Sequence, residues 1–394
     1  MNILLPVIIG CSEPVVEQTL SFNFIDGASS EQIELLSSTH TNTPMATARS
    51  LNAYNAAVST EETISIQIEG EAEPRTANFD VFGYARIPLP AESPRLYHFS
   101  AEGSEESFTT YKLPENPTSR LALLTALPNG NIPSSAARGS GGYIFSFDNE
   151  LWWQDMAAGS DSFLVLLTPN PILGLWSNHI DGDGILDCIV WTQNQAFLMR
   201  GNVEGGLSWG GGIEFDEGRV VAASVADLNG DRISDIAIGV TTENESTIAI
   251  FESDGNWTFS EGNHFFLAYP LEGMVAEDED KDGRPDLSVI DESTGYIRRY
   301  TYNLTGWMGG TPSIIEPTTY IAPTGSHLPP MEDLNADGRK DLLIIGAENN
   351  NVQDFTFFII NNGSTIYKQQ YSPFFAKFRD VDQNGSTDVL AFTD

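Results

Sequence analysis

The stretch Asp278-Glu-Asp280-Lys-Asp282-Gly283-Arg-Pro-Asp286 gives the pattern D-x-[DN]-x-[DN]-G-x-x-D, which recurs through the second half of this 394-residue chain. The same pattern, or a close variant of it, occupies residues 179–187, 227–235, 333–341 and 380–388. The last aspartates of the five segments are separated by 48, 51, 55 and 47 residues. A period of about 50 residues is typical of a four-stranded β-propeller blade and exceeds that of most helical or leucine-rich repeats.

The segments between these Asp-rich loops have the character of strands. Each loop is followed by a short apolar run, as in Cys188-Ile-Val-Trp191 and Leu342-Leu-Ile-Ile345. Short runs of this kind, rich in β-branched residues and ended by turn residues, indicate buried strands. A second hairpin follows, with Asp254-Gly255 or Asn362-Gly363 at its tip, and these dipeptides favour tight β-turns. The sequence therefore predicts an all-β protein with four strands per repeat.

Two further repeats, without the Asp-rich pattern, are predicted from strand-like segments in residues 63–113 and 120–170. The last repeat has only two strands before residue 394, which would leave an unpaired sheet edge. Strand-like segments within residues 19–36 are expected to supply the missing strands and close a seven-bladed β-propeller. The expected division is 1–16 as a signal and lipid-anchor segment, 17–62 as closing strands and a loop, and 63–394 as the propeller repeats.

The loops have the chemistry of a calcium site. Calcium takes six to eight oxygen ligands, and side chains at positions 1, 3 and 5 of a tight loop converge on one point. Position 9 adds a carboxylate, position 7 a backbone carbonyl, and glycine at position 6 supplies a positive φ. The twelfth-position Glu and the flanking helices of an EF-hand are missing. The expected cofactor is Ca²⁺, and its strongest expected ligands are Asp278, Asp280, Asp282, Asp286, Asp333, Asn335, Asp337, Asp341, Asp380, Asp382, Asn384 and Asp388.

Two loops depart from the pattern. In loop 227–235 Arg232 replaces the glycine, so we expect backbone strain there and a cation near the ligands. In loop 179–187 His179 replaces the leading Asp. The sequence leaves open whether these loops hold metal or whether Asp, Asn and Gly only shape turns. Their candidate ligands are Asp181, Asp183, Asp187, Asp227, Asn229, Asp231 and Asp235.

These loops and the strands around them resemble the FG-GAP and VCBS repeat families, which include the propeller domain of integrin α subunits. The resemblance covers residues 172–394 by motif and residues 63–171 by strand pattern only. It implies that each Asp-rich loop joins the first and second strands of a blade and holds calcium on the lower rim. It also implies that ligands bind on the opposite face.

Composition restricts the possible partners. Lys and Arg number 19 against 55 Asp and Glu, for a formal net charge of -36. Nucleic acid and anionic lipid surfaces would repel such a chain, so we expect no nucleic-acid partner. An extracellular or saline setting, where cations screen or bind the carboxylates, is favoured. No segment has the roughly 18 to 20 continuous apolar residues of a membrane span.

The first residues resemble a bacterial lipoprotein signal. An apolar run, Ile3 to Ile9, precedes Gly10-Cys11-Ser12, which places a small residue before a cysteine that could carry lipid. We therefore expect lipidation of Cys11 and a cell-surface protein anchored to a bacterial outer membrane only through that lipid. The alternative is an ordinary apolar strand, because no positively charged segment precedes the run. With Cys188 as the second of two cysteines, a disulfide framework is excluded.

The predicted function is recognition rather than catalysis: a calcium-stabilised extracellular module that binds a protein or glycan on a cell surface or matrix. The alternative is a propeller-scaffold enzyme, such as a polysaccharide lyase or hydrolase. Gly206-Leu-Ser208-Trp-Gly210 matches the G-x-S-x-G nucleophile motif. That motif needs a helix after the serine, and the strand-like residues that follow Gly210 argue against a catalytic Ser208.

Overall fold

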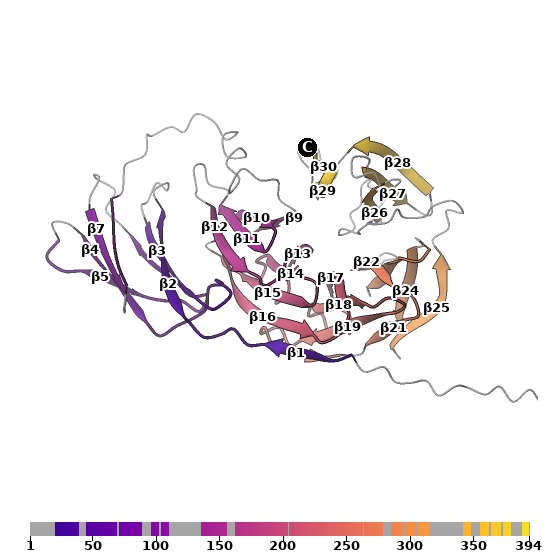
Figure 1. The fold of residues 1–394 in the computed structure, drawn as a ribbon, viewed down its shortest axis with the longest axis horizontal. Coiled ribbons are helices and arrows are strands. Elements are labelled where there is room, and N and C mark those ends of the chain that lie inside the picture. Colours follow the sequence, from indigo (N-terminus) through magenta and orange to yellow (C-terminus); the bar gives the residue numbers. More distant parts are fainter. Residues whose placement is uncertain are drawn as a thin grey trace, which may run out of the picture.

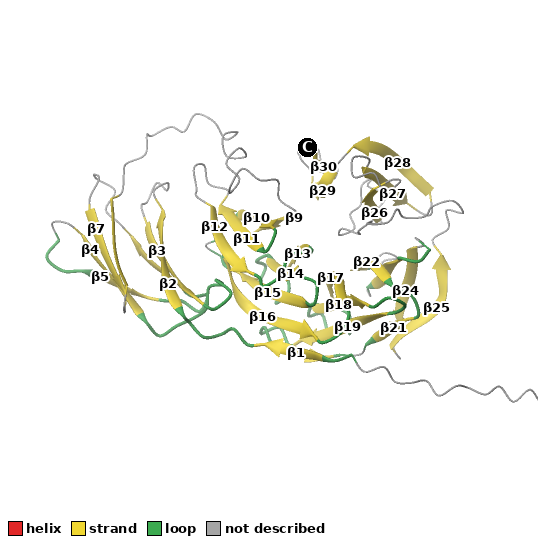
Figure 2. Cartoon of the chain, in the orientation of Figure 1, coloured by secondary structure: helices red, strands yellow, loops and turns green. Residues whose placement is uncertain are grey.

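The computed structural model describes residues 20–38, 45–68, 71–88, 96–101, 104–109, 135–155, 162–203, 205–262, 264–278, 285–294, 297–303, 306–314, 342–347, 355–361, 364–371, 373–379 and 388–393. These residues form strands and loops, and they include no helix that could cross a membrane (Figure 2). The all-β class predicted from the sequence is therefore confirmed.

Seven strands near the N-terminus form a two-sheet sandwich, seen on the left of Figure 1. Its buried residues come from both sheets, with Ile64, Ile66 and Ile68 of one sheet facing Ala48 and Ile87 of the other. One sheet has the order β2 (Gln32–Ser38), β3 (Met45–Leu51), β6 (Tyr84–Pro88), and the other β5 (Arg75–Asn78), β4 (Thr63–Ile68), β7 (Leu96–Ala101), β8 (Ser104–Thr109).

This sandwich corrects the expected blade at residues 63–113 and the expected loop within 17–62. Strand β4 alternates between exposed and buried residues, so it buries one face only. A one-faced sheet needs a single partner layer, as in a sandwich, whereas a propeller blade is covered on both faces. The second sheet supplies that layer, and its strands β2 and β3 come from residues expected to close the ring or to form a loop.

Sheets that follow one another along the chain make up the rest of the described structure (Figure 1). In the first four, neighbouring strands are antiparallel and largely follow chain order. They are β9 (Ser135–Gly139), β10 (Gly142–Phe147), β11 (Glu150–Asp155), β12 (Ser162–Leu167); β13 (Gly174–Asn178), β14 (Asp187–Trp191), β15 (Gln195–Gly201), β16 (Leu207–Phe215); β17 (Arg219–Ala226), β18 (Asp235–Thr241), β19 (Ser246–Ser253), with β20 (Phe259–Glu261) and β21 (Phe265–Leu267) both on β19; and β22 (Leu271–Glu277), β23 (Asp286–Asp291), β24 (Ile297–Asn303), β25 (Gly306–Ile314).

Two smaller sheets complete the series, β26 (Leu342–Ala347), β27 (Phe355–Asn361), β28 (Ser364–Tyr371) and β29 (Pro373–Arg379), β30 (Asp388–Thr393). The first strands of successive sheets lie against one another, β9 against β13, β13 against β17 and β17 against β22. Strand β29 lies against β9, which brings the last sheet back to the first. This arrangement is β-propeller-like. The described residues give six sheets in this series, not the seven blades expected.

Apolar layers between neighbouring sheets explain why their strands are so deeply buried. One layer joins the first and second sheets through Trp153, Cys188 and Phe197. Another joins the second, third and fourth sheets and includes Ile238 and Phe251. Because both faces of the inner sheets are covered, β18 is buried at every position. Cys188 is a fully buried thiol in β14.

The N-terminal strand β1 (Phe22–Ile25) pairs antiparallel with β16, at the outer edge of the second sheet. The ring closure expected from residues 17–38 is therefore corrected: β1 adds to a complete sheet and does not pair with β29 or β30. Side-chain packing explains why β1 pairs with β16: the centroid of the Phe22 ring lies 6.3 Å from that of Phe215 and 5.1 Å from that of Phe251. Residues 1–16, with the proposed lipidation site Cys11, lie outside the described residues.

A buried loop joins the sandwich to the first two sheets of the series. Ala57 is fully buried, and its carbonyl accepts the amide of Trp209 in β16 at 2.7 Å. Tyr54 accepts the amide of Leu167 in β12 and stacks on the Trp209 ring at 5.2 Å. The Tyr84 hydroxyl adds a 2.9 Å hydrogen bond to a β16 carbonyl. Sandwich and sheets thus share a packed, hydrogen-bonded interface.

Candidate functional sites: the Asp-rich loops and a pocket at the opposite strand ends

Loop 227–235 connects β17 to β18, the first and second strands of its sheet. Its side chains turn onto its own backbone: Asp227 accepts the amides of Gly230 at 2.7 Å and Arg232 at 2.8 Å, and Asp231 accepts that of Ile233 at 2.8 Å. The Asn229 amide group donates to Asp231 at 3.2 Å. Arg232 has a φ of 73°, so the strain expected where it replaces glycine is present.

Loop 179–187 connects β13 to β14, and one of its carboxylates has partners outside the loop as well as within it. Asp183 accepts the amide of Ile185 at 2.7 Å within the loop. Asp181 accepts the amide of Asp183 at 3.0 Å within the loop, and it also accepts hydrogen bonds from outside the loop, from Arg200 Nε at 3.2 Å and Trp257 Nε1 at 2.8 Å. His179, at the first position, places Nδ1 2.9 Å from the Ile185 carbonyl oxygen.

The ninth residues of both loops, Asp187 and Asp235, are fully buried. Asp187 accepts the amides of Ile180 in its loop and Gly201 at the end of β15, each at 2.8 Å. Asp235 likewise accepts loop amides and the amide of Ser253 at the end of β19. Burial raises the pKa of each carboxyl to about 6, although these hydrogen bonds oppose the shift. Each ninth residue thus fastens a loop to the third strand of its sheet, a role that the sequence reading missed.

The three loops predicted to be the best calcium sites lie largely outside the described residues. Asp278 and Asp286 flank the first of them, and Asp286 is buried at the start of β23. Asp388 begins β30. The other expected ligands that fall outside the described residues are Asp280, Asp282, Asp333, Asn335, Asp337, Asp341, Asp380, Asp382 and Asn384. Within the described ranges, no three acidic, histidine or cysteine side chains are grouped so that they could hold a metal.

A pocket of about 560 Å³ opens at the strand ends opposite these loops. The Asp-rich loops join first to second strands, so in antiparallel sheets the turns from second to third strands lie at the other end. The lining comes from such turns, and from the segments that lead into β17 and β22, in three successive sheets. The residues are Gln193, Gly218, Arg219, Thr241, Thr242, Glu243, Pro270, Glu292 and Ser293.

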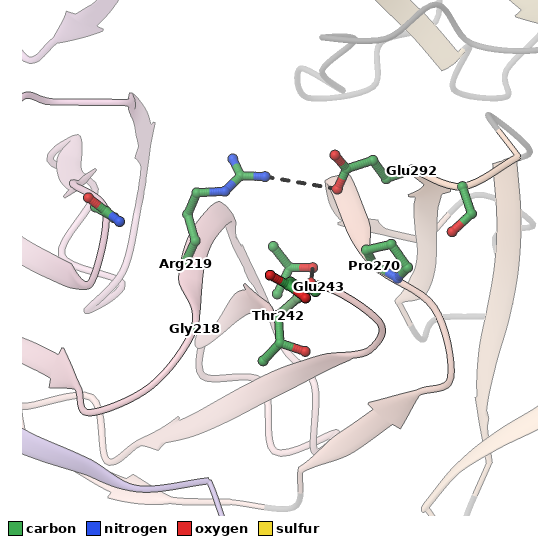
Figure 3. A pocket seen from close by; sticks show the side chains of 9 residues that line it. Gly218, Arg219, Thr242, Glu243, Pro270 and Glu292 are labelled. Atoms are coloured by element: carbon green, nitrogen blue, oxygen red, sulfur yellow. Dashed lines mark hydrogen bonds and ion pairs between the residues drawn. The ribbon is translucent and has the colours of Figure 1, made fainter.

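Most of the lining residues have polar side chains, which supply one guanidinium, two carboxylates, hydroxyls and an amide, and none of the lining residues is aromatic. Arg219 and Glu292 extend toward each other across it, above Thr242 and Glu243 (Figure 3). Their closest charged atoms, Nη2 and Oε2, are 3.9 Å apart, and both side chains are more than a third exposed. Such an exposed pair contributes about 0–1 kcal/mol, so a polar ligand can separate it at little cost. No motif in the sequence marked these residues.

Residues 179–238 match the FG-GAP-like repeat family. The matched segment begins with one described Asp-rich loop, contains the second, and ends in β18. The resemblance to FG-GAP repeats inferred from the sequence is confirmed for this part of the chain. No functionally curated protein matches the chain significantly.

The chain is similar to several solved structures at low sequence identity. A protein from Lactobacillus plantarum is 12% identical, with a TM-score of 0.43 over 84% of this chain and 92% of that one. BBS1N, crystallised in complex with ARL6DN, is 11% identical, with a TM-score of 0.42 over 86% and 91%. A rhamnogalacturonan lyase from Bacillus licheniformis is 10% identical, with a TM-score of 0.36 over 93% and 74%. Likeness at this level does not indicate a shared activity.

Ser208, the serine of the G-x-S-x-G match, is buried near the start of β16. Its hydroxyl donates to the Arg200 carbonyl at 3.3 Å, and a strand continues after it to Phe215. The helix that a nucleophile of this type requires is not formed by the described residues that follow.

Proposed function

We propose that this chain is a calcium-stabilised extracellular recognition module that binds a protein or glycan ligand in the pocket beside Arg219 and Glu292. The observation that carries the proposal is the origin of the pocket: turns and linking segments of three successive sheets, at the strand ends opposite the Asp-rich loops. Its volume is in the range of ligand-binding clefts, and its groups can donate and accept hydrogen bonds to hydroxyls or peptide groups.

Calcium enters the proposal through loops 278–286, 333–341 and 380–388. Each offers at least three carboxylates, with glycine at the sixth position. Hard oxygen ligands of this kind suit Ca²⁺, which would offset the repulsion among the carboxylates. The ion has a structural role in this proposal, while recognition occurs at the other strand ends. A surface location with a lipid on Cys11 belongs to the same proposal.

The test compares immobilised panels of glycans and of purified matrix and surface proteins, probed with wild type and with single variants. Arg219→Ala and Glu292→Ala should each weaken binding at least tenfold, because each removes a charged group from the pocket. Glu217→Ala is the matched control, since Glu217 is exposed on the segment before β17 but does not line the pocket. Equal binding by all four proteins would refute the pocket as the site.

An enzyme built on the same scaffold would use the same pocket, where Arg219, Glu243 and Glu292 are the titratable lining residues. The same panels therefore include a time course for shortened or unsaturated glycan products. If wild type and Glu217→Ala release such products and Arg219→Ala does not, the function is catalysis and not recognition.

A further inference from the structure

Asp181 lies at a junction between three parts of the molecule. Its side chain is only 3% exposed, although it belongs to a surface loop of the second sheet. One carboxylate oxygen, Oδ2, accepts hydrogen bonds from Arg200 on β15 and from Trp257, in the hairpin between β19 and β20 of the third sheet. The other, Oδ1, accepts the amide of Asp183 at 3.0 Å.

The Arg200 guanidinium is held on more than one side. Its central carbon lies 4.9 Å from the ring centroid of Phe82, in the sandwich, and 5.9 Å from that of Trp257. Both distances are within cation–π range. Gly210 on β16 makes room for the indole, since a Cβ there would lie 2.7 Å from a Trp257 ring carbon. The cation therefore bridges a loop, a neighbouring sheet and the sandwich.

Three positions of the same loop that would supply oxygen ligands to calcium are engaged by other groups or carry no oxygen. Position 3 is Asp181, already paired with a guanidinium. Position 7 is Ile185, whose carbonyl would complete a calcium shell but lies 2.9 Å from His179 Nδ1. Because a carbonyl only accepts, Nδ1 must carry the proton, so position 1 supplies a donor where calcium needs an oxygen.

We infer that Arg200 is the internal cation of loop 179–187, taking the place that a divalent ion has in a metal-binding loop of this pattern. The loop is then metal-independent, and the contacts between the second sheet, the third sheet and the sandwich form without calcium. This inference stands whether or not loops 278–286, 333–341 and 380–388 hold the ion.

The test uses the full chain and the variants Asp181→Asn, Arg200→Gln and their combination. Bound calcium is counted by native mass spectrometry, and the unfolding midpoint is measured in chelator and in millimolar calcium. We expect an unchanged calcium count for all three variants. Each single variant should lower the midpoint by the same few degrees in both buffers, and the double variant by little more than either single one, because both remove one interaction.

Asp282→Asn is the matched control, because Asp282 belongs to a loop proposed to hold calcium. This variant should bind one calcium ion fewer than wild type, and its unfolding midpoint should be lowered in the calcium buffer but not in chelator. Loss of an ion in Asp181→Asn, or a midpoint drop that disappears in chelator, would overturn the inference. So would additive effects of Asp181→Asn and Arg200→Gln. If wild type binds no calcium at all, the calcium proposal fails, while the coupling measured in chelator still decides the role of Arg200.

A gain-of-site variant provides an independent readout. Combining His179→Asp with Arg200→Gln restores an acidic first position and removes the internal cation. We expect this protein to bind one calcium ion more than wild type and to become more dependent on calcium for stability. If the folded variant binds the same number of calcium ions as wild type, Arg200 does not take the place of an ion in this loop.

Discussion

Asp187 combines full burial with two backbone hydrogen bonds, and its pKa is raised from 3.8 to about 6 because burial disfavours the charged form. Between these two pH values the folded chain binds a proton that the unfolded chain does not, so the contribution of this group to stability falls as pH rises through the window. In calcium-free buffer, wild type should therefore gain stability relative to Asp187→Asn on acidification from about pH 7 to about pH 4.

The direct measurement is a carbon-13 titration of the Asp187 carboxyl, with an expected midpoint near 6. A midpoint close to 3.8, or parallel stability profiles for wild type and Asp187→Asn, would show that the hydrogen bonds outweigh burial.

The strained backbone at Arg232 should lower stability in a way that can be measured. With a φ of 73° and an exposed side chain, it occupies a conformation that favours glycine. Arg232→Gly should raise the free energy of unfolding by about 0.5–1 kcal/mol, since relief of strain exceeds the greater entropy of the unfolded chain. Chemical denaturation measures it. Gly230→Ala is the converse control: with a φ of 85° and open space around its Cβ, it should lower stability by about 1 kcal/mol.

Single residues also show where sequence reasoning stopped. The strain at Arg232 could be predicted because one position departs from a short pattern. The pairing of Asp181 with Arg200 and Trp257 could not, since these partners are 19 and 76 residues away and meet only when two sheets pack. The ninth aspartates were identified as carboxylates of the loops, but their attachment to the third strand depends on sheet geometry.

Strand β1 is the element that most changes the expected architecture. Phe22 packs its ring against Phe215 and Phe251, which belong to two different sheets, whereas Phe24 is 55% exposed. Phe22→Ala should therefore lower the free energy of unfolding by about 2 kcal/mol, below the usual cost for a fully buried Phe, and Phe24→Ala by well under about 1 kcal/mol. Urea denaturation of the two variants measures the difference. Equal effects would mean that β1 contributes only backbone pairing.

At the scale of elements, repeated strands were predicted well and unrepeated ones poorly. The runs after the first three Asp-rich loops in the chain are the buried strands β14, β18 and β23, as expected. The loop register fixes where those strands begin. Residues 63–113 contain no Asp-rich loop, so the sequence fits both a propeller blade and a sandwich sheet. Only the structure shows whether one face of these strands is buried or both.

Calcium should stabilise the molecule as a whole, because several sites would act on one folding equilibrium. A site with a dissociation constant of about 0.1–1 mM adds about 2.7 kcal/mol at a hundred times that concentration. Chelation should lower the melting temperature, millimolar calcium should restore it, and magnesium should do so poorly because it demands a small octahedral shell.

Asp282→Ala should remove one bound ion and part of the calcium-dependent gain. Asp148→Asn is the control, since Asp148 lies between β10 and β11, away from every Asp-rich loop. Calorimetry that detects no calcium binding, together with melting that is insensitive to chelator, would reject these loops as metal sites.

The buried loop around Ala57 predicts that sandwich and sheets unfold together. Ala57 has no exposed surface and lies between the sandwich and β16. Ala57→Leu would overpack this interface and should lower the free energy of unfolding by about 1–3 kcal/mol. Differential scanning calorimetry should show one transition for wild type. Two separate transitions, with only one shifted by Ala57→Leu, would show that the interface does not couple the two parts.

The pocket is lined by turns and linking segments, so its residues can change without changes in the strands. Its lining residues sit in short turns, at strand ends and in linking segments, while the apolar layers that hold the sheets together lie within the strands. Substitutions in those turns can change shape and charge at the mouth without disturbing the layers below, much as loops vary on an antibody framework. Under the proposed function, preference for a ligand can therefore change while the framework stays the same, and a library randomised at Gln193, Thr242, Glu243 and Ser293 should yield folded proteins that bind other ligands.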